Sequence, residues 1–289
     1  GNRIWIGTMA GVYIFENGKI KSFNKDTILN NSSVYSIFID YNKNIWFGTI
    51  QNGVIFFNKK TNEIKRFNTS NGLLNNLIFS ISQVGNGDVL IGTQTGLNTI
   101  DSQFKVKELA AIPTNTNLAI SSLLQNSESE FYYGTHAEGV NKFDLKTNTR
   151  NAKYNFYNGL TKNPIQCLFK DRENNLWIGT DGSGVYKYSN NKFTYYIKEN
   201  GLSENYINTV AQDKKGNYWI ALRGNGLIKI KDGELTPYKL MPYSKNSIPD
   251  NDINVILPLN DGRVIFGTKQ GLCSFENETF TLIHDENFK

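Results

Sequence analysis

Short apolar runs alternate with short polar turns along the whole chain. Runs such as Val34–Ile39 and Ile45–Thr49 are rich in β-branched and aromatic residues, and turns rich in Asn, Asp, Gly and Lys separate them. Runs of this length and composition predict β-strands joined by tight connections. The pattern therefore predicts an all-β chain.

One apolar run recurs seven times at a nearly constant spacing. The copies are Ile4–Thr8, Ile45–Thr49, Val89–Thr93, Phe131–Thr135, Leu176–Thr180, Tyr218–Leu222 and Val264–Thr268. A repeat of just over 40 residues, built from aromatic-rich strands with Gly at the turns, is typical of a β-propeller blade. The sequence predicts a single seven-bladed β-propeller over residues 1–289, with four-stranded antiparallel blades. Its repeat units cover approximately residues 1–32, 33–75, 76–116, 117–161, 162–203, 204–250 and 251–289.

The second repeat shows the strands of one blade, which we name a to d in chain order. They are Val34–Ile39, Ile45–Thr49, Gly53–Phe57 and Glu63–Phe67. Because strand direction alternates, the b–c loops and the d–a connections are expected at one end of the propeller, and the a–b and c–d turns at the other.

Three residue types of the repeat are expected to serve the scaffold. Four tryptophans share one strand position and are predicted to pack between blades: Trp5, Trp46, Trp177 and Trp219. Three aspartates precede a Trp by six residues and are predicted to accept hydrogen bonds from the amides of their own turns: Asp40, Asp171 and Asp213. The Gly two residues after the Trp is predicted to make room for a neighbouring blade.

The first repeat begins directly at strand b. The seven b–c–d sets are accompanied by six a strands, so the first blade is expected to lack its innermost strand within this chain and to have an unpaired edge. This count predicts that the chain is part of a longer polypeptide. A strand from just before Gly1 or just after Lys289 would complete the first blade.

Composition excludes several classes of function. The net charge of +5 comes with no basic run longer than a pair of lysines, which argues against nucleic-acid binding. Cys167 and Cys273 are expected to be buried free thiols. No nucleophile motif, phosphate-binding loop or zinc-spaced cluster occurs, so no catalytic residue, metal or cofactor is predicted.

The combined pattern resembles the two-component regulator propeller repeat. The resemblance rests on Leu176–Thr180 followed by Gly184, and on Asn-Gly-Leu segments before strand a, at Asn71–Leu74, Asn158–Thr161 and Asn200–Ser203. It implies the periplasmic or extracellular sensing domain of a membrane-bound bacterial histidine kinase or hybrid two-component system, often one that responds to oligosaccharides. The implied membrane contact lies only in segments absent from this chain, and the full-length receptor could form a homodimer.

Variable loops on a rigid scaffold usually carry recognition, so the ligand site is expected on the face of the b–c loops and d–a connections. The b–c loops contribute the candidate ligand-binding residues Gln51, Gln94, His136, Glu138, Asp181, Arg223, Asn225 and Lys269. The d–a connections contribute Asn205, Tyr206 and Tyr243. Their amides, phenols and guanidinium suit an oligosaccharide or a similar polar ligand. Arg223 stands out because the repeat itself is broken there, with Ala221-Leu222 in place of Gly-Thr.

Two alternatives stay open at this point. A propeller polysaccharide lyase or glycosidase could draw its carboxyls from Glu138, Asp181, Asp250 and Asp252, although nothing in the sequence pairs them. A protein-interaction scaffold is the other alternative. The WD-repeat family is its best-known version, but the Trp-Asp dipeptides that close the blades of that family do not occur in this sequence.

Overall fold

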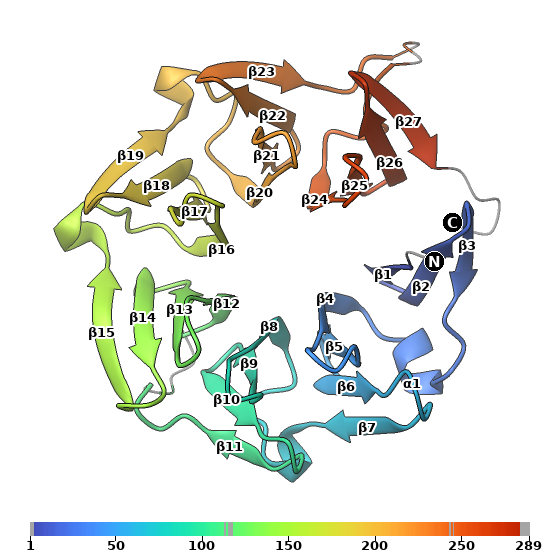
Figure 1. Cartoon of the computed structure of the whole chain (residues 1–289), viewed down its shortest axis with the longest axis vertical. Coiled ribbons are helices and arrows are strands. Elements are labelled where there is room, and N and C mark those ends of the chain that lie inside the picture. The colour runs from blue at the N-terminus through green and yellow to red at the C-terminus, as the bar shows by residue number, and fades with distance from the viewer. Residues whose placement is uncertain (1–2, 113, 115–117, 243, 245, 284–289) are drawn as a thin grey trace. The chain divides into compact units, whose positions relative to one another are not determined.

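The computed structural model describes residues 3–112, 114, 118–242, 244 and 246–283. It contains seven small antiparallel sheets, one for each predicted repeat, and almost no helix (Figure 1). Six sheets have four strands, and the first has three. The seven-bladed β-propeller class is therefore confirmed, and so is the lack of an inner strand in the first blade among the described residues.

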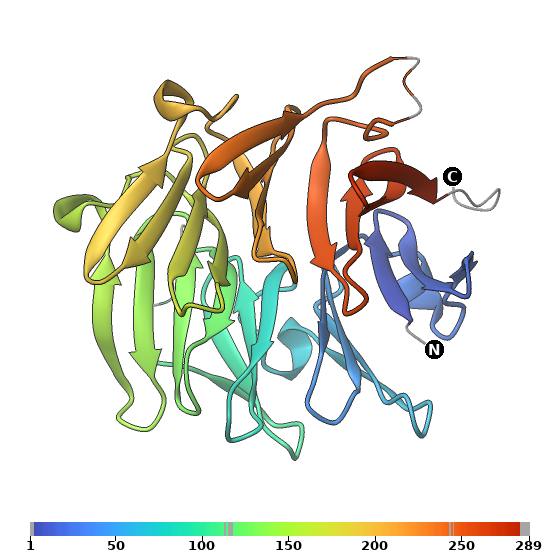
Figure 2. The ribbon, with the colours of Figure 1, turned by 45° about the horizontal axis from the view of Figure 1, so that its top comes forward.

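The chain divides into two compact units, residues 1–154 and 155–289. Within each sheet the strands follow one another in chain order as antiparallel neighbours (Figure 2). No helix among the described residues is long and apolar enough to cross a membrane.

The first unit holds four sheets and two short helices. The sheets are β1 (Ile4–Thr8), β2 (Gly11–Glu16) and β3 (Lys19–Ser22); β4 (Val34–Ile39), β5 (Ile45–Thr49), β6 (Val54–Phe57) and β7 (Ile64–Phe67); β8 (Ile78–Gln83), β9 (Val89–Thr93), β10 (Leu97–Ile100) and β11 (Val106–Glu108); and β12 (Ile120–Gln125), β13 (Glu130–Thr135), β14 (Val140–Asp144) and β15 (Thr149–Tyr154). The helices are α1 (Thr27–Asn30) and the 3₁₀ turn η1 (Thr69–Asn71).

The second unit holds three sheets and two 3₁₀ turns. The sheets are β16 (Ile165–Lys170), β17 (Leu176–Thr180), β18 (Val185–Ser189) and β19 (Lys192–Tyr196); β20 (Ile207–Gln212), β21 (Tyr218–Leu222), β22 (Gly226–Lys231) and β23 (Glu234–Tyr238); and β24 (Ile253–Pro258), β25 (Val264–Thr268), β26 (Gly271–Glu276) and β27 (Thr279–Ile283). The turns are η2 (Phe156–Asn158) and η3 (Lys198–Asn200).

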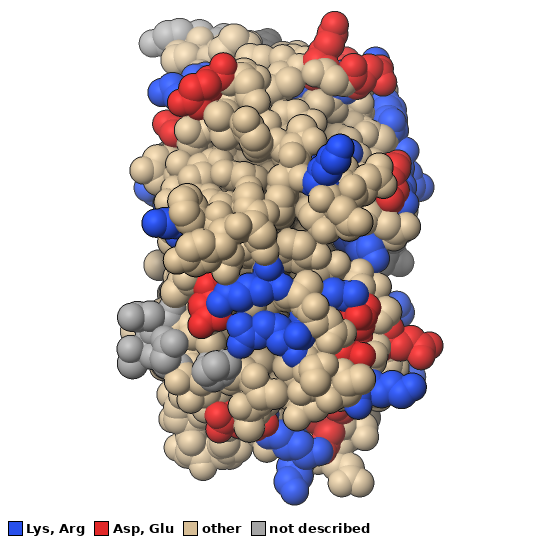
Figure 3. Space-filling model, turned by 90° about the vertical axis from the view of Figure 1, so that its left-hand side faces the viewer, with Lys and Arg blue, Asp and Glu red and all other residues tan. Residues whose placement is uncertain are grey.

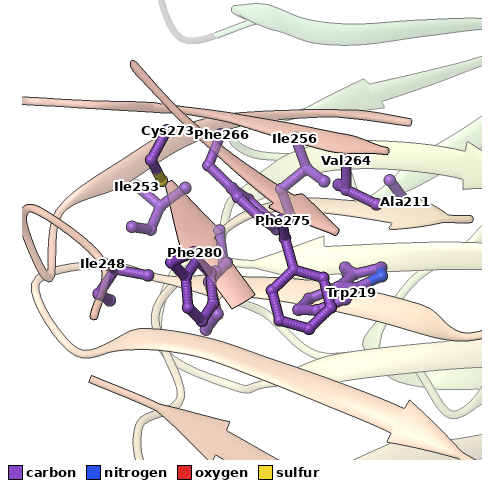
Figure 4. Packing of buried hydrophobic residues seen from close by; sticks show 12 residues of the cluster. Ala211, Trp219, Ile248, Ile253, Ile256, Val264, Phe266, Cys273, Phe275 and Phe280 are labelled. Atoms are coloured by element: carbon purple, nitrogen blue, oxygen red, sulfur yellow. The ribbon is translucent and has the colours of Figure 1, made fainter. Parts of the chain in front are cut away.

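The apolar core lies between neighbouring sheets. Figure 4 shows one such cluster in the second unit, where Trp219 of β21 meets side chains of β25, β26 and β27. Its ring centroid is 4.9 Å from that of Phe275 and 5.3 Å from that of Phe266. Edge-to-face contacts of this kind stabilise the packing beyond the burial of area alone.

On the face drawn in Figure 3, lysine and arginine side chains lie singly or in small groups, several of them next to aspartates and glutamates.

Three of the four repeat tryptophans are buried, and each makes the same hydrogen bond to an aspartate of its own sheet. The indole Nε1 of Trp46, Trp177 and Trp219 donates to Oδ2 of the Asp six residues earlier, over 2.8–3.0 Å. The other carboxylate oxygen accepts the amide at the end of the turn, as at Asn44 and Asn175. The predicted scaffold roles of Trp and Asp are thus confirmed in these three sheets.

Trp5 departs from the prediction that all four tryptophans are core residues. It is only half-buried, although its ring packs against Phe23 and Phe47 at centroid distances of 5.1 and 5.7 Å. The reason is that, among the strands that the structure describes, none covers the inner edge of β1.

The repeat Gly lies where a neighbouring sheet approaches closely. A Cβ added to Gly48 would lie 2.7 Å from Cγ2 of Ile78, which begins the inner strand of the next sheet, and would also overlap Oγ of Ser36. The same approach recurs at Gly179, where Cγ2 of Ile207 would be 2.8 Å away. Glycine is therefore required at both positions by space, as predicted.

We expect Gly48→Ala to lower the free energy of unfolding by about 1–3 kcal/mol, because the added methyl group over-packs the contact between sheets. Urea denaturation measures the change. The double variant with Ile78→Ala should lose less than the sum of the two single losses, because the second substitution removes Cγ2 of Ile78, one of the atoms that the new methyl group meets. Additive losses would contradict a steric contribution from the contact between the two sheets.

Asp171 connects two sheets through one carboxylate oxygen. Its Oδ2 accepts hydrogen bonds from Trp177, Asn175 and the Tyr218 hydroxyl at 2.8–2.9 Å, and Tyr218 belongs to the next sheet. Burial alone raises the pKa of this carboxyl, but these hydrogen bonds outweigh it, so the pKa is lowered below the ordinary value.

We expect Asp171→Asn to cost about 2–4 kcal/mol at pH 7, because it replaces a buried acceptor with an amide that leaves donors unpaired. A carboxyl with a lowered folded pKa contributes stability above its unfolded pKa of about 3.9 and loses it as pH falls through the folded value. The wild type should therefore lose stability more steeply than the variant below about pH 4. Urea titrations over that range test this.

Asp261→Asn is the matched control. Asp261 also has a lowered pKa, from its hydrogen bond to Arg263, but both side chains are well exposed. Its loss should stay below about 1 kcal/mol.

Candidate functional site

The b–c loops and the d–a connections lie together at one end of the sheets, as strand direction predicts. In the second unit, the amide of Asp181 in the β17–β18 loop donates to the Pro164 carbonyl at 2.9 Å. The amide of Arg223 in the β21–β22 loop donates to the Tyr206 carbonyl, also at 2.9 Å. These backbone bonds hold the loops in fixed positions.

Asp181, Tyr206 and Arg223 form one cluster in the second unit. Asp181 and Tyr206 pair as an isolated antiparallel bridge. Nη1 of Arg223 lies 2.8 Å from Oδ1 of Asp181, and its Cζ lies 5.8 Å from the centroid of the Tyr206 ring. Sequence reasoning selected all three residues separately, and the structure brings them together.

The Asp181–Arg223 contact is an ion pair without an aligned hydrogen bond. Asp181 Oδ1 is buried and accepts no hydrogen bond among the described residues, although the guanidinium nitrogen is at ion-pair distance. Nε of Arg223 donates instead to Oδ1 of Asn208, over a long 3.4 Å. Arg223 is 45% exposed at its side chain and Tyr206 is 46% exposed, so the guanidinium and the phenol ring both present surface to solvent.

The cluster is suited to a neutral, hydroxyl-rich ligand. The ion pair cancels its own charge, while an exposed aromatic ring beside guanidinium and amide groups offers apolar contact together with directional hydrogen bonds. Asn208 belongs to this cluster, and sequence reasoning missed it.

Asn205 has a different environment from that of its neighbour Tyr206. Its Oδ1 accepts the Lys198 amide at 2.8 Å, and its carbonyl accepts the Gly184 amide at 2.8 Å. Asn76 and Asn251 make the equivalent bonds in other sheets. The geometry therefore indicates that Asn205 braces the loop.

The other candidates of the second unit stand outside the cluster. The Asn225 side chain donates to the Ser203 carbonyl at 3.1 Å, and Lys269 is exposed with its amide bonded to Asp252. Tyr243 lies outside the described residues.

In the first unit the four candidates lie on three successive b–c loops. Gln51 and Gln94 are exposed. Glu138 is engaged by Nζ of Lys153 at 3.1 Å and by Arg150 at 3.4 Å. His136 lies beside Phe79 with ring centroids 5.6 Å apart.

Phe79 is the centre of an aromatic row that sequence reasoning missed. On its other side, Tyr35 meets it edge to face at 5.5 Å, and Tyr35 is 57% exposed. Tyr35, Phe79 and His136 thus line up across three neighbouring sheets of the first unit. Such a row offers ring faces on which the apolar side of a ligand can stack.

The missed residues share one cause, a β-bulge. Each inner strand shifts register at its second residue, so that this residue has no partner on strand b. The bulged residues are Tyr35, Phe79, Ser121, Gln166, Asn208 and Asn254. A bulge re-aims the side chain that it carries. The sequence did offer one signal for these residues. The first residue of each inner strand is always Val or Ile, whereas the second residue differs in type from one repeat to the next.

Among the described residues, no group of three or more His, Cys, Asp or Glu side chains could hold a metal ion. Both cysteines are free; Cys273 is buried as predicted, whereas Cys167 is partly exposed. Burial raises the pKa of each thiol to about 12, so both stay protonated at neutral pH.

Comparison with known families finds a match for three segments of the chain. The family model described as two component regulator propeller matches residues 28–51, 159–182 and 201–224. These three segments are similar to the two-component regulator propeller repeat, which confirms the resemblance read from the sequence.

The relatives extend this picture. Histidine kinase P4 of Formosa agariphila is 25% identical over 216 residues, which cover 65% of this chain and 15% of the relative. The chain thus spans only a small part of that protein's length.

Solved structures share the fold at low identity. The extracellular domain of a putative one component system from B. thetaiotaomicron superposes with a TM-score of 0.59 at 18% identity, over 97% of this chain and 45% of that one. Virginiamycin B lyase from Staphylococcus aureus gives a TM-score of 0.70 at 13% identity, over 89% and 85% of the two chains. At these identities the likeness shows the fold.

We expect Arg223→Ala to change the free energy of unfolding by less than about 1 kcal/mol, because its ion pair is half-exposed and screened by solvent. Urea denaturation measures the change, and Arg263→Ala, which removes another exposed pair, serves as the control. A loss above about 2 kcal/mol would show that Arg223 serves the scaffold.

Proposed function

We propose that this chain is the extracytoplasmic ligand-binding module of a two-component signalling protein and that it recognises an oligosaccharide or a similar polar ligand. The proposed binding face consists of the b–c loops, the d–a connections and the bulged residues beside them. Within it, Arg223, Tyr206 and Asp181 make the polar contacts of the second unit.

One observation carries the proposal. The cluster around Arg223 places charged, amide and aromatic groups at the surface where the repeat pattern is broken, and the fold gains little from it. The scaffold residues of the same sheet, such as Trp219 and Asp213, are buried and satisfy each other. An arrangement of polar and aromatic groups that does not serve packing is explained by recognition.

The comparisons support the signalling part of the proposal. Three segments match the family model described as two component regulator propeller. The relative from Formosa agariphila is a histidine kinase, and one solved structure with the same fold is the extracellular domain of a putative one component system. A location outside the cytoplasm, in the periplasm or at the cell surface, agrees with these relatives. The kinase would then lie in another part of the polypeptide.

The chemistry of the face supports a saccharide. Sugars present hydroxyl groups for directional hydrogen bonds and an apolar ring face for stacking. The Arg223 cluster offers the first kind of contact, and the row Tyr35, Phe79 and His136 offers the second.

An enzyme of the lyase or glycosidase type is the competing proposal, and the similarity in fold to virginiamycin B lyase favours it. Of the four carboxyls considered for that role, Glu138 is held by Lys153 and Arg150, and Asp181 is paired with Arg223. Product formation from an oligosaccharide panel, followed by chromatography, would decide for the enzyme and against a purely sensory domain.

We expect a matching oligosaccharide at about 100 times its dissociation constant to add roughly 2.7 kcal/mol of stability, which raises the melting temperature by several degrees. A thermal-shift screen over neutral and acidic oligosaccharides measures this. Arg223→Ala and Tyr206→Ala should each remove most of the shift.

Lys231→Ala, at the far end of β22, is the control and should leave the shift unchanged. A ligand whose shift survives both Arg223→Ala and Phe79→Ala would contradict the proposed face. Absence of any shift across the panel would contradict the saccharide class.

A further inference from the structure

The guanidinium group of Arg223 has hydrogen-bond donors that the protein does not use. Its Nη1 lies 2.8 Å from Oδ1 of Asp181, but no N–H is aligned with that oxygen, so charge alone holds the two groups together. Nε donates to Oδ1 of Asn208 over a long 3.4 Å. Among the described residues, Nη1 and Nη2 donate no hydrogen bond, and the side chain is 45% exposed. A guanidinium carries five N–H groups, so the remaining ones are available to a ligand.

The carboxylate of Asp181 has unused capacity as an acceptor. Its Oδ1 is buried and accepts no hydrogen bond among the described residues, while the side chain as a whole is 27% exposed, so Oδ2 is the oxygen that faces solvent. Asp213 in the same unit accepts on both oxygens, from the amide of Asn217 in its own turn and from the indole of Trp219. Asp181 thus differs from the scaffold carboxylates, since it does not brace a turn.

Backbone contacts fix the positions of both charges. The Asp181 amide donates to the Pro164 carbonyl, and the Arg223 amide donates to the Tyr206 carbonyl, each at 2.9 Å. The Tyr206 ring lies against Gly182, where an added Cβ would come within 3.3 Å of Cε1 of the ring. The loop that carries Asp181 is therefore held without its carboxylate, and a substitution that changes only the side-chain charge leaves the loop in place.

An acceptor beside a donor at one surface selects the chemical group that it binds. A hydroxyl group accepts from a guanidinium and donates to a carboxylate at the same time, whereas a ligand carboxylate only accepts and an ammonium group only donates. A ligand carboxylate on Arg223 would also lie next to the negative charge of Asp181, and like charges at close range are rejected. Hydroxyl groups thus fit both side chains, and charged groups fit one of them.

We propose that Asp181 is a specificity-determining residue that makes the Arg223 cluster accept uncharged sugars and reject uronic acids. Its carboxylate neutralises the guanidinium and repels a second carboxylate, while it accepts a hydrogen bond from a sugar hydroxyl. This inference rests on the proposed saccharide-binding function of the same face and names the class of sugar that the face takes.

Acetate is the first probe, because it tests the exclusion of carboxylates without any sugar. It is titrated into the ¹⁵N-labelled protein while the Nε–H resonance of Arg223 is followed, with that resonance assigned through Arg223→Lys. We expect acetate to bind Arg223 at least about tenfold more tightly in Asp181→Asn than in the wild type, because the like charge beside the guanidinium is gone. Asn is close to Asp in size and leaves the backbone contacts of the loop intact.

Matched oligosaccharides are the second probe. Each pair shares one backbone and differs only in carrying a hydroxyl or a carboxyl at the sixth carbon: cellotriose with tri-glucuronate, mannotriose with tri-mannuronate, and galactotriose with tri-galacturonate. Isothermal titration calorimetry gives the affinity for both members of each pair. The wild type should prefer the neutral member of the pair that it binds. Asp181→Asn should shift this preference toward the uronate by at least about tenfold.

Asp232→Asn is the matched control for net charge. Asp232 is exposed in the β22–β23 turn, at the opposite end of its sheet from the Arg223 loop, and its loss removes the same charge. It should leave both the acetate titration and the preference within a pair as they are in the wild type. An equal effect of Asp232→Asn would show that the total charge of the protein is responsible rather than the position of Asp181.

The inference is wrong if acetate shifts the Arg223 resonance equally in the wild type and in Asp181→Asn, or if the wild type prefers the uronate of a pair. It is also wrong if Asp181→Asn keeps the preference of the wild type. Absence of binding to all six oligosaccharides by both proteins would count against the proposed saccharide function, whereas the acetate titration would still decide the role of Asp181. The two failures are therefore distinguishable.

Discussion

The spacing of neighbouring sheets depends on the contact between a glycine of one sheet and the first side chain of the next inner strand. Ile78 lies against Gly48 in the first unit, and Ile207 lies against Gly179 in the second. Because nothing larger than hydrogen fits between them, this contact sets how closely the sheets approach. The aromatic clusters between the sheets, such as that of Trp219 with Phe266 and Phe275, form at that separation.

The buried carboxylates satisfy the polar groups that this close packing creates. Asp40, Asp171 and Asp213 accept from an indole on one oxygen and from their own turn on the other, so each turn is fixed relative to the core. At Asp171 the same oxygen also accepts the Tyr218 hydroxyl of the next sheet. Scaffold and candidate site are therefore separated in space as well as in chemistry. The paired buried groups lie at the a–b turns, whereas exposed and loosely paired groups lie at the b–c loops.

Much of the fold could be predicted from the sequence because the same strand pattern occurs seven times along the chain. Strand order, the scaffold roles of Trp, Asp and Gly, and the three-stranded first sheet all follow from comparing copies within the chain. The candidate site could be predicted less well from the sequence. Asp181, Tyr206 and Arg223 were selected as separate loop residues, but their contact depends on how two adjacent sheets are spaced, which a repeat length does not give. Phe79 and Asn208 were missed because a bulge leaves no trace in strand propensity. Asn205 was selected for its polarity, although its carbonyl and side chain brace the loop.

The recurring bulge has a consequence for how such a molecule changes over time. At an ordinary strand position, alternate side chains belong to the packing on one face or the other, so a substitution alters stability. At the second residue of each inner strand, the bulge removes the side chain from that alternation. Ser121, Gln166 and Asn254 hold the same backbone place as Tyr35 and Phe79 with unrelated side chains. Side chains of unrelated size and polarity are therefore accommodated at one backbone position, so specificity can change there while the architecture remains constant.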